Sequence, residues 1–559
     1  MNAIIAVKQY ITKMVDDCGS GMKVLLMDKE TTSIVSMVYA QSEILQKEVY
    51  LFESIEQPNR ETMKHLKAIC FIRPTQDNVE LIQQELQSPK YGFYYLYFSN
   101  RLGKQALKAI ASADEQELVR EVQEFYADYF AVNKNLFTLN IPCCYQNMSW
   151  KRDKLDRSIE GIAALLLSLK KNPVIRYQQS SDNAKQVAEG LKRLINKEGA
   201  LFDFRKSDVA PVLIILDRKE DPVTPILNQW TYQAMIHELL TIRKNVVDLS
   251  YVPGISKELK QLIFSGEQDE FYDKNLYRNF GEIGQNIKSL MEKFQEKSQR
   301  SQKLESIADM KAFVESYPEF KKMSGTVSKH VTVVSELSKI VTEQDLLALS
   351  EVEQEISCQT SHSNAVEMIN KVLHNEKATD LNLLRIILLY ALRYEHHSGN
   401  QLHRFLDVLS RRDFPDQYKK AIQAVLQYGG KKSRGSDIFG GNTPLSITKK
   451  FFKGLKGVEN IYTQHTPLVQ DVLDSLVKGK LSDGQYPYAT GSPVRDRVQD
   501  VIIFIAGGAT YEEAYSVQNF CSINQGVRVL LGGTYVHNFK SFLEEVTAAS
   551  QRATDGLKW

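Results

Sequence analysis

Short apolar runs and amphipathic helical patterns alternate through the first 140 residues of the chain. Strand-like runs of β-branched and aromatic residues occupy residues 23–28, 49–55, 67–74, 92–99 and 136–141. Helical patterns lie between several of these runs, at 78–86 and 115–130. Regular alternation of this kind predicts an open, mostly parallel sheet covered by helices. The chain is therefore expected to begin with an α/β domain.

A second α/β region is predicted to be split along the chain. Residues 151–200 have a helical pattern, and the apolar run at 210–217 then opens a new strand. From 251 to 480 the pattern is helical, and strands return only after residue 498. The roughly 60 residues that follow are too few for a core of their own. They are expected to complete the sheet begun near residue 211, with the helical block as a large insertion.

Four boundaries follow from this organisation. The first α/β domain is expected at 1–135 and a discontinuous second α/β domain at 136–250 and 481–559. The inserted helical domain is expected in two parts, 251–350 and 351–480. The predicted fold class is therefore α/β plus α.

Composition and charge remove several classes of function. The 559 residues are 43 % hydrophobic and 25 % charged, which is ordinary for a globular protein with substantial cores. A net charge of +2 argues against a dedicated polyanion binder. Six cysteines without a C-x-x-C pair indicate neither a disulfide framework nor a structural zinc site. No apolar run approaches the ~20 residues that span a bilayer, so a cytosolic protein is expected. No cofactor and no metal are expected either.

The segment ILDRKEDPVTPILNQWTY, residues 215–232, is the strongest candidate for chemistry. Asp217, Glu220 and Asp221 follow an apolar strand, where many α/β proteins place a metal or an acid/base pair. One hypothesis is therefore a hydrolase or phosphatase that uses this acidic cluster. Phosphoaspartate chemistry fits poorly, because that motif needs two aspartates separated by a single residue.

The competing hypothesis is structural. Asp217 would close the strand, and Asp221 with Pro222 would form a turn. Thr224 would be the N-cap of a buried helix, with Pro225 at the first helical position, where its missing N–H costs nothing. The charged residues would join domains and catalyse nothing.

Two other motifs fail as chemical sites. HELLT at 237–241 begins like a metalloprotease helix but has Thr241 where the second histidine ligand must stand. Gly507 and Gly508 lie between a strand and a helix but lack a Walker lysine. Because Glu512 and Glu513 already complement that helix dipole, a tight strand-to-helix turn is expected there.

The acidic segment resembles the most characteristic block of the SM (Sec/Munc-type) family of SNARE-binding proteins. That block has an apolar strand, an Asp-Arg pair, an acidic turn, Thr-Pro and an aromatic-rich helix. Further similar blocks lie at 309–337, 383–392 and 503–514. The resemblance covers essentially the whole chain.

The resemblance implies a non-enzymatic, arch-shaped protein with two α/β domains and a helical domain inserted into the second. It implies a regulator that binds a syntaxin and promotes SNARE complex assembly in vesicle docking and membrane fusion. VPGISKEL (252–259) and the end GGTYVHNFKSFLEEV (532–546) resemble the branch serving endosomal, trans-Golgi and vacuolar protein transport. The implied partners are an endosomal or trans-Golgi syntaxin (a Qa-SNARE), its SNARE complex and a rabenosyn-type Rab effector. A monomer attached peripherally to endosome and trans-Golgi network membranes through SNAREs is expected.

The resemblance also carries over a site for the N-terminal peptide of a syntaxin. It would lie on a helix matching residues 115–125 of the first domain. Leu118, Val119 and Val122 would form its apolar wall, and Glu124 would be a polar contact for a basic peptide.

A second site is a SNARE-binding hairpin matching residues 309–337, with Tyr317, Pro318 and Phe320. Pro318 is expected at its turn, because proline disfavours an unbroken helix and the α conformation of Tyr317. Six residues of the acidic segment and the helix after it are expected to be structural: Asp217, Arg218, Thr224, Pro225, Trp230 and Glu238.

Overall fold

The computed structural model describes residues 1–205, 208–302, 307–412, 414–435, 438–439, 461–491 and 497–551. The chain forms two compact units. The first consists of Met1–Arg218, Val469–Ala509 and Val517–Val536, and the second of Lys219–Leu468, Thr510–Ser516 and His537–Trp559. The chain passes from the first unit to the second inside the acidic segment, between Arg218 and Lys219.

The first unit opens with a parallel sheet of five strands in the order β2-β1-β3-β4-β5. The strands are β1 (Lys23–Met27), β2 (Val49–Ser54), β3 (Met63–Ile72), β4 (Tyr91–Phe98) and β5 (Val119–Glu124). The helices are α1 (Ala3–Asp17), α2 (Lys29–Val38), α3 (Gln41–Leu45), α4 (Gln76–Gln87) and α5 (Lys104–Ala113). The predicted parallel sheet and its first four strands are confirmed.

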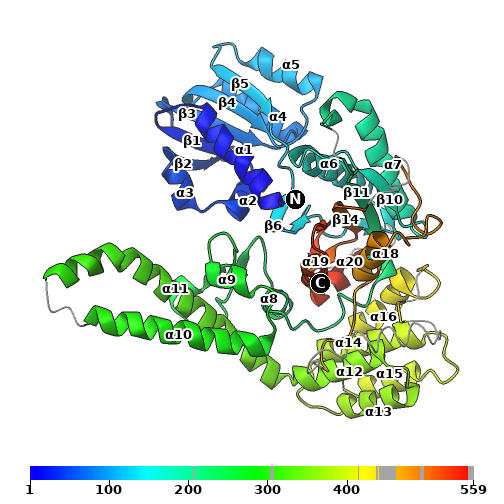
Figure 1. Ribbon diagram of the computed structural model, residues 1–559. Helices are drawn as coiled ribbons and strands as arrows, with labels where there is room; N and C mark the ends of the chain where they lie inside the picture. The colour runs from blue at the N-terminus through cyan, green and yellow to red at the C-terminus, as the bar shows by residue number, and fades with distance from the viewer. Residues whose placement is uncertain are drawn as a thin grey trace. The chain divides into compact units, whose positions relative to one another are not determined.

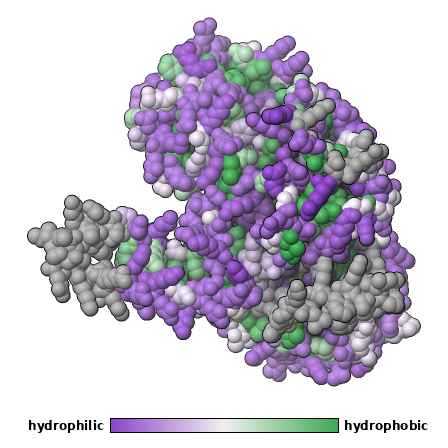
Figure 2. All heavy atoms as spheres, viewed as in Figure 1, coloured by the Kyte–Doolittle hydropathy of each residue, from purple (hydrophilic) through white to green (hydrophobic). Residues whose placement is uncertain are grey.

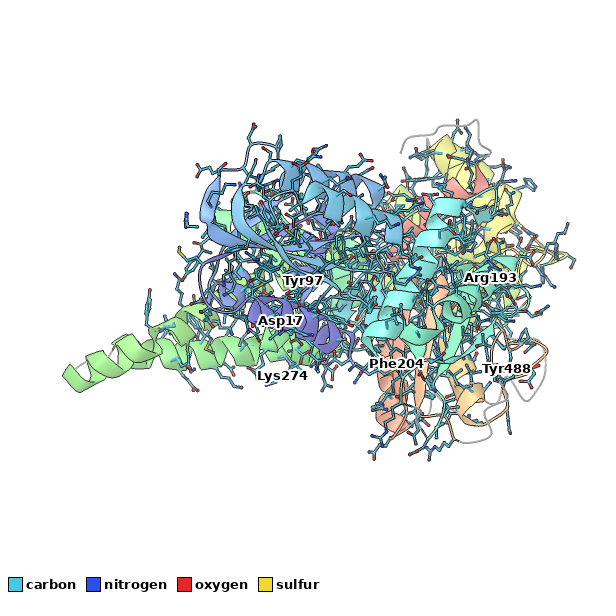
Figure 3. All side chains as sticks on the ribbon, turned by 90° about the horizontal axis from the view of Figure 1, so that it is seen from above. Asp17, Tyr97, Arg193, Phe204, Lys274 and Tyr488 are labelled. Carbon is cyan, nitrogen blue, oxygen red and sulfur yellow. The ribbon has the colours of Figure 1, made fainter. Side chains whose placement is uncertain are left out.

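Helices cover both faces of this sheet (Figure 1). On one face, Leu26 and Leu96 pack with Val79 of α4 and Ile110 of α5 in a single buried cluster. Successive side chains of a strand point to opposite sides, so the second face of the sheet must also be covered. Helices α1 and α2 lie over this face. Tyr97, labelled in Figure 3 near the end of α1, packs on Phe125 at 4.8 Å, and Phe125 stacks on Tyr10 of α1 at 5.0 Å.

The second sheet confirms the predicted insertion. Its order is β10-β11-β14-β16-β7-β6, so strands from the C-terminal part lie between strands from residues 130–217. All neighbours are parallel except β6 and β7. Its strands are β6 (Phe130–Asn133), β7 (Leu136–Thr138), β10 (Val174–Tyr177), β11 (Val212–Asp217), β14 (Asp500–Ala506) and β16 (Arg528–Gly533).

Helix α7 (Asp182–Lys197) packs on β10 and β11, and α6 (Arg152–Ser168) packs on α7. Strand β10 interrupts the stretch expected to be wholly helical. The edge of β10 is covered by residues 485–490, whose backbone bonds to Tyr177, Gln179 and Ile175. Tyr488, labelled in Figure 3, lies 4.4 Å from the Arg176 guanidinium. Short strands also occur, at β8 (Tyr145–Gln146), β9 (Ser149–Trp150), β15 (Ala509–Thr510) and β17 (Val536–His537).

The second unit is mainly helical, as predicted for 251–480. Its helices are α8 (Tyr232–Leu239), α9 (Glu270–Asn275), α10 (Phe280–Gln302), α11 (Ile307–Glu343), α12 (Leu346–Cys358), α13 (His362–Leu373), α14 (Asp380–Tyr394), α15 (Leu402–Ser410), α16 (Asp416–Gly429) and α20 (Phe539–Ser550). Strands β12 (Val246–Asp248) and β13 (Gln261–Ile263) form a small antiparallel pair. Helices α18 (Leu468–Val477) and α19 (Tyr511–Ile523) have residues in both units.

Within this unit α10 and α11 run side by side, and α12–α16 form a bundle (Figure 1). Hydrophilic residues cover most of the face seen in Figure 2, with apolar residues scattered among them. No helix in the described ranges is long and apolar enough to cross a membrane.

The helix expected at 115–130 is wrong. Residues 119–124 form β5, which pairs with β4 through Tyr94↔Val119 and Leu96↔Val122. Val119 and Val122 are three apart and so satisfied a helical pattern, but β-branched residues also suit a strand, and pairing with a neighbour decides such cases. The Asp114 carboxylate, which accepts the Leu118 and Val119 N–H groups, helps to begin the extended segment.

The turn expected at Pro318 is also wrong. Helix α11 runs through Pro318 without interruption, and the hairpin is formed by α10 with α11. The connection between them falls between Gln302 and Ile307, outside the described residues. A proline inside a helix removes one backbone hydrogen bond at a cost of about 3 kcal/mol, which the remaining turns of a 37-residue helix can offset.

Candidate functional site

The strand end of the acidic segment is buried and held by hydrogen bonds within the first unit. The Asp217 carboxylate accepts a hydrogen bond from the hydroxyl of Ser181, the N-cap residue of α7. The Asp217 N–H donates to Gln178 Oε1 at 3.1 Å. Arg218 Nε donates to the Gly508 carbonyl at 3.0 Å. The Asp-Arg pair therefore joins the end of β11 to α7 and to the turn after β14.

The remaining carboxylates of the segment are occupied in the same way within the second unit. Glu220 accepts the Gly435 N–H at 2.8 Å. Asp221 accepts the Thr224 hydroxyl at 2.6 Å, the Thr224 N–H at 3.0 Å and the Leu468 N–H at 3.1 Å. The three carboxylates of the segment are at most 3 % exposed, whereas a hydrolase must present such groups to a substrate. The hydrolase or phosphatase hypothesis is unsupported.

The helix predicted to start at Thr224 is wrong. Residues 224–226 form a turn that contains Pro225, and α8 begins at Tyr232 after the N-cap Thr231. Thr224 is a donor to Asp221 and caps no helix. An aspartate that bonds the backbone N–H three residues ahead stabilises a tight turn, which competes with helix formation.

Loss of the Thr224 hydroxyl is expected to destabilise this turn. Thr224→Val keeps the shape of a fully buried side chain but leaves Asp221 with one donor fewer. The free energy of unfolding should fall by about 1–2 kcal/mol, the usual cost of an unmatched buried acceptor. Urea unfolding followed by tryptophan fluorescence measures it. The matched control is Thr342→Val, because the Thr342 hydroxyl is exposed and bonds only its own helix; equal losses in the two variants would refute the assignment.

A buried ionic network lies behind the acidic segment, in the second unit. Arg385 of α14 donates to Glu238 of α8 at 2.5 Å, to the Ile226 carbonyl, and lies 3.7 Å from Glu353 of α12. Its guanidinium also lies 4.2 Å from the Phe539 ring. The network therefore holds α8, α12 and α14 together with the start of α20.

Each carboxylate of the network has further donors. Glu238 accepts the Phe539 N–H at 3.0 Å, and Glu353 accepts the N–H and side-chain amide of Asn228 at 2.8 and 2.6 Å. Complete burial raises the pKa of Glu353 to about 7, although Arg385 and Asn228 oppose the shift. Trp230 is buried as predicted but precedes α8, and its indole donates to Ser350 of α12 at 2.9 Å.

Sequence reasoning placed Glu238 among the structural residues but missed Arg385 and Glu353. The available signal was Arg385 itself, a charge inside the otherwise apolar run NLLRIILLYAL. A charged residue in such a run must find a partner, because an unpaired buried charge is costly. The partner could not be named from the sequence.

The residues expected to bind a syntaxin peptide lie together on the edge of the first sheet. Leu118 and Val119 are partly buried against its core, and Val122 is 39 % exposed. Glu124 already accepts the Leu102 N–H at 2.7 Å and the Tyr126 hydroxyl at 2.6 Å. The surface therefore has an apolar strip along an edge strand. Glu124 is already bonded to Leu102 and Tyr126 and so stabilises the local structure.

The residues expected in the SNARE-binding hairpin lie on α11. Tyr317 is 50 % exposed, and Phe320 stacks on Phe294 of α10 with ring centroids 5.2 Å apart. The contact between Phe320 and Phe294 joins α11 to α10. The outer surface of the hairpin is therefore formed by other residues.

The structure tests the predicted glycine turn and also shows whether ligands for a metal ion are grouped together. Gly507 and Gly508 have φ of 86° and 99°, a conformation that favours glycine. Glu513 accepts the Thr510 N–H at 2.9 Å and its hydroxyl at 3.1 Å, so the predicted tight turn is confirmed. Within the described residues no group of three or more histidine, cysteine or carboxylate side chains is arranged to hold a metal ion.

Two sheets covered by helices, with a helical insertion between strands of the second sheet, define the class of fold. Residues 23–545 match the Sec1 family, and the chain belongs to that family. It is 60 % identical over 550 residues to human vacuolar protein sorting-associated protein 45, covering 98 % of this chain and 96 % of the relative. The relative of the same name from Dictyostelium discoideum is 46 % identical over 552 residues, covering 98 % and 97 %.

Solved structures agree. The SM protein Vps45 in complex with the Qa SNARE Tlg2 superposes with a TM-score of 0.92 at 46 % identity, covering 98 % of both chains. The Unc18–syntaxin 1 complex from Monosiga brevicollis superposes with a TM-score of 0.81 at 20 % identity, covering 99 % of this chain and 100 % of that chain. The second likeness bears on the fold alone.

Proposed function

We propose that the chain is an SM-type regulator of SNARE-mediated vesicle fusion that binds a Qa-SNARE and promotes SNARE complex assembly. The observation that carries the proposal is the superposition over nearly the whole chain on an SM protein bound to a Qa SNARE. The buried, hydrogen-bonded state of the acidic segment agrees with a protein that has no enzymatic activity.

Two surfaces are proposed to bind SNAREs. The apolar strip of Leu118, Val119 and Val122 would receive the N-terminal peptide of a Qa-SNARE at the edge of the first sheet. The α10–α11 hairpin, with Tyr317 exposed on α11, would bind SNARE helices along its length, the usual way in which an extended helical surface recognises amphipathic partners.

The wider setting is proposed from the same relatives. Vacuolar protein sorting is named in the relatives, which favours a role at endosome and trans-Golgi network membranes, with attachment through SNAREs. A rabenosyn-type Rab effector as second partner and a monomeric state complete the proposal. So do the four domain boundaries, 1–135, 136–250 with 481–559, 251–350 and 351–480.

The peptide surface is tested by binding of a synthetic Qa-SNARE N-terminal peptide. Wild-type protein should bind, and both Val122→Arg and Leu118→Arg should weaken binding by at least about tenfold, because each places a charge in an apolar contact. Isothermal titration calorimetry measures the affinity. Val122 is the sharper position, since its side chain is already 39 % exposed and its replacement should leave the fold intact.

The control is Leu107→Arg, an equally exposed leucine on α5 of the same unit, at 44 % exposure. This variant should bind as the wild type does. Failure of the wild type to bind the peptide would remove the peptide site, and equal weakening in all three variants would show a non-specific charge effect.

A further inference from the structure

A buried polar array joins α11 to two other elements of the second unit. Its members are Tyr232, the first residue of α8, Asp269, the N-cap of α9, and the adjacent Lys329 and His330 of α11. The Tyr232 hydroxyl lies 2.7 Å from His330 Nδ1, and His330 Nε2 lies 2.9 Å from Asp269 Oδ2. Lys329 forms an ion pair with the same carboxylate.

Aromatic rings surround His330, at the centre of the array. His330 is fully buried, with its ring 4.6 Å from that of Phe271. Lys329 Nζ lies 4.9 Å from the Phe264 ring and donates to the Ile263 carbonyl at 3.0 Å. Lys274 of α9 is labelled in Figure 3 beside the green helices of the hairpin.

Charge decides how the hydrogen bonds run. Burial lowers the pKa of His330, so its ring is neutral near neutral pH. Burial would raise the pKa of Asp269, but His330 and Lys329 hold it below its ordinary value. An ionised Asp269 can only accept, so His330 Nε2 carries the hydrogen and donates to it. His330 Nδ1 then accepts from Tyr232, and every polar atom of the ring is matched.

The array lies where α11 changes character. From Tyr317 to Ser328 no residue of this helix is buried, and Lys329 is partly buried, whereas Val333, Leu337 and Val341 beyond it are buried. His330 is the first buried residue after the open stretch. Contacts that fix α11 at this point therefore set the direction of the stretch that precedes it.

We infer that Tyr232, Asp269, Lys329 and His330 form the positioning device of the α10–α11 hairpin, fixing the direction in which α11 presents its open stretch to SNARE helices. The inference rests on the proposed function, since it names what orients the binding surface. A binding site must be held within a fraction of an ångström to be effective, and buried, fully matched hydrogen bonds give that rigidity where apolar packing alone allows sliding. These are positioning residues, because they act through α11.

The test removes a single oxygen atom. Tyr232→Phe deletes the donor to His330, and the matched control is Tyr272→Phe, a neighbouring buried tyrosine whose hydroxyl lies near Gln233 and is not a member of the array. Amide hydrogen exchange of residues 326–334 should be about tenfold faster in Tyr232→Phe and unchanged in Tyr272→Phe. Qa-SNARE-containing complex assembly, followed by fluorescence transfer, should be at least about threefold slower in Tyr232→Phe alone. Asp269→Asn should have both effects.

Binding of the Qa-SNARE N-terminal peptide should stay at the wild-type level in all variants, a result that a general loss of folding would not give. Unchanged exchange in both Tyr232→Phe and Asp269→Asn would overturn the inference. So would faster exchange with an unchanged assembly rate. A wild-type protein that leaves assembly unaccelerated would overturn the proposed function itself, and all variants would then share the uncatalysed rate.

Discussion

Arg385→Met is expected to lower the free energy of unfolding by about 3–5 kcal/mol, the range measured when one partner of a buried ion pair is removed. The Arg385 side chain is 3 % exposed and bonds Glu238 and the Ile226 carbonyl. Methionine fills a similar volume but leaves Glu238 and Glu353 as buried carboxylates without a cation. The loss should appear as a lower midpoint in urea unfolding and as a lower melting temperature.

Neutralising the carboxylates should restore much of that loss. In the triple variant Arg385→Met, Glu238→Gln, Glu353→Gln no buried charge remains, and replacing a whole buried ion pair is often close to neutral. The surface control Arg404→Met should change stability by no more than about 0.5 kcal/mol, because that side chain is exposed. A triple variant as unstable as the single one would show that packing against Phe539, and not charge, is what Arg385 contributes.

The buried parts of the two sheets were predictable because their strands are continuous apolar runs. Strands that are covered on both faces, such as β1, β11 and β14, are apolar except at one end, so they stand out from amphipathic helices. The insertion followed from chain length, since the C-terminal segment is too short to form a hydrophobic core of its own. Edge strand β5 escaped detection because one side of an edge strand faces water and its sequence is largely polar.

The candidate site shows a different limit. The burial of Asp217, Glu220 and Asp221 agrees with the structural hypothesis, but the helix start moved from Thr224 to Tyr232 because Asp221 stabilises a local turn. Arg385 and Glu238 are 147 residues apart, so their pairing is a product of helix packing that no local pattern encodes. Local rules identified which residues needed partners. Tertiary structure alone identifies the partners.

A single aspartate ties the two sheets of the first unit together, and its loss should have an effect as large as that of Arg385. Asp128, which precedes β6, is 2 % exposed. Its carboxylate accepts from Arg157 Nη2 at 3.0 Å and Asn100 Nδ2 at 2.9 Å, and it forms an ion pair with Arg73, whose Nε lies 3.1 Å away. Arg73 and Asn100 follow strands of the first sheet, whereas Arg157 lies on α6 beside the second.

Asp128→Asn keeps the shape of the side chain but removes the carboxylate that pairs with both Arg73 and Arg157. Burial lowers the pKa of Arg157, and Asp128 is the first of the carboxylates that oppose this shift. The expected loss is about 3–5 kcal/mol, as for other broken buried pairs. The control Asp153→Asn removes an exposed carboxylate that pairs with Lys154 at 3.6 Å and should cost less than about 1 kcal/mol. Because Asp128 joins elements of both sheets, hydrogen exchange should rise in the loops after β3 and β4 and in α6 together. A rise confined to one of these elements would mean that the sheets are held by apolar packing, and that the aspartate stabilises only its own loop.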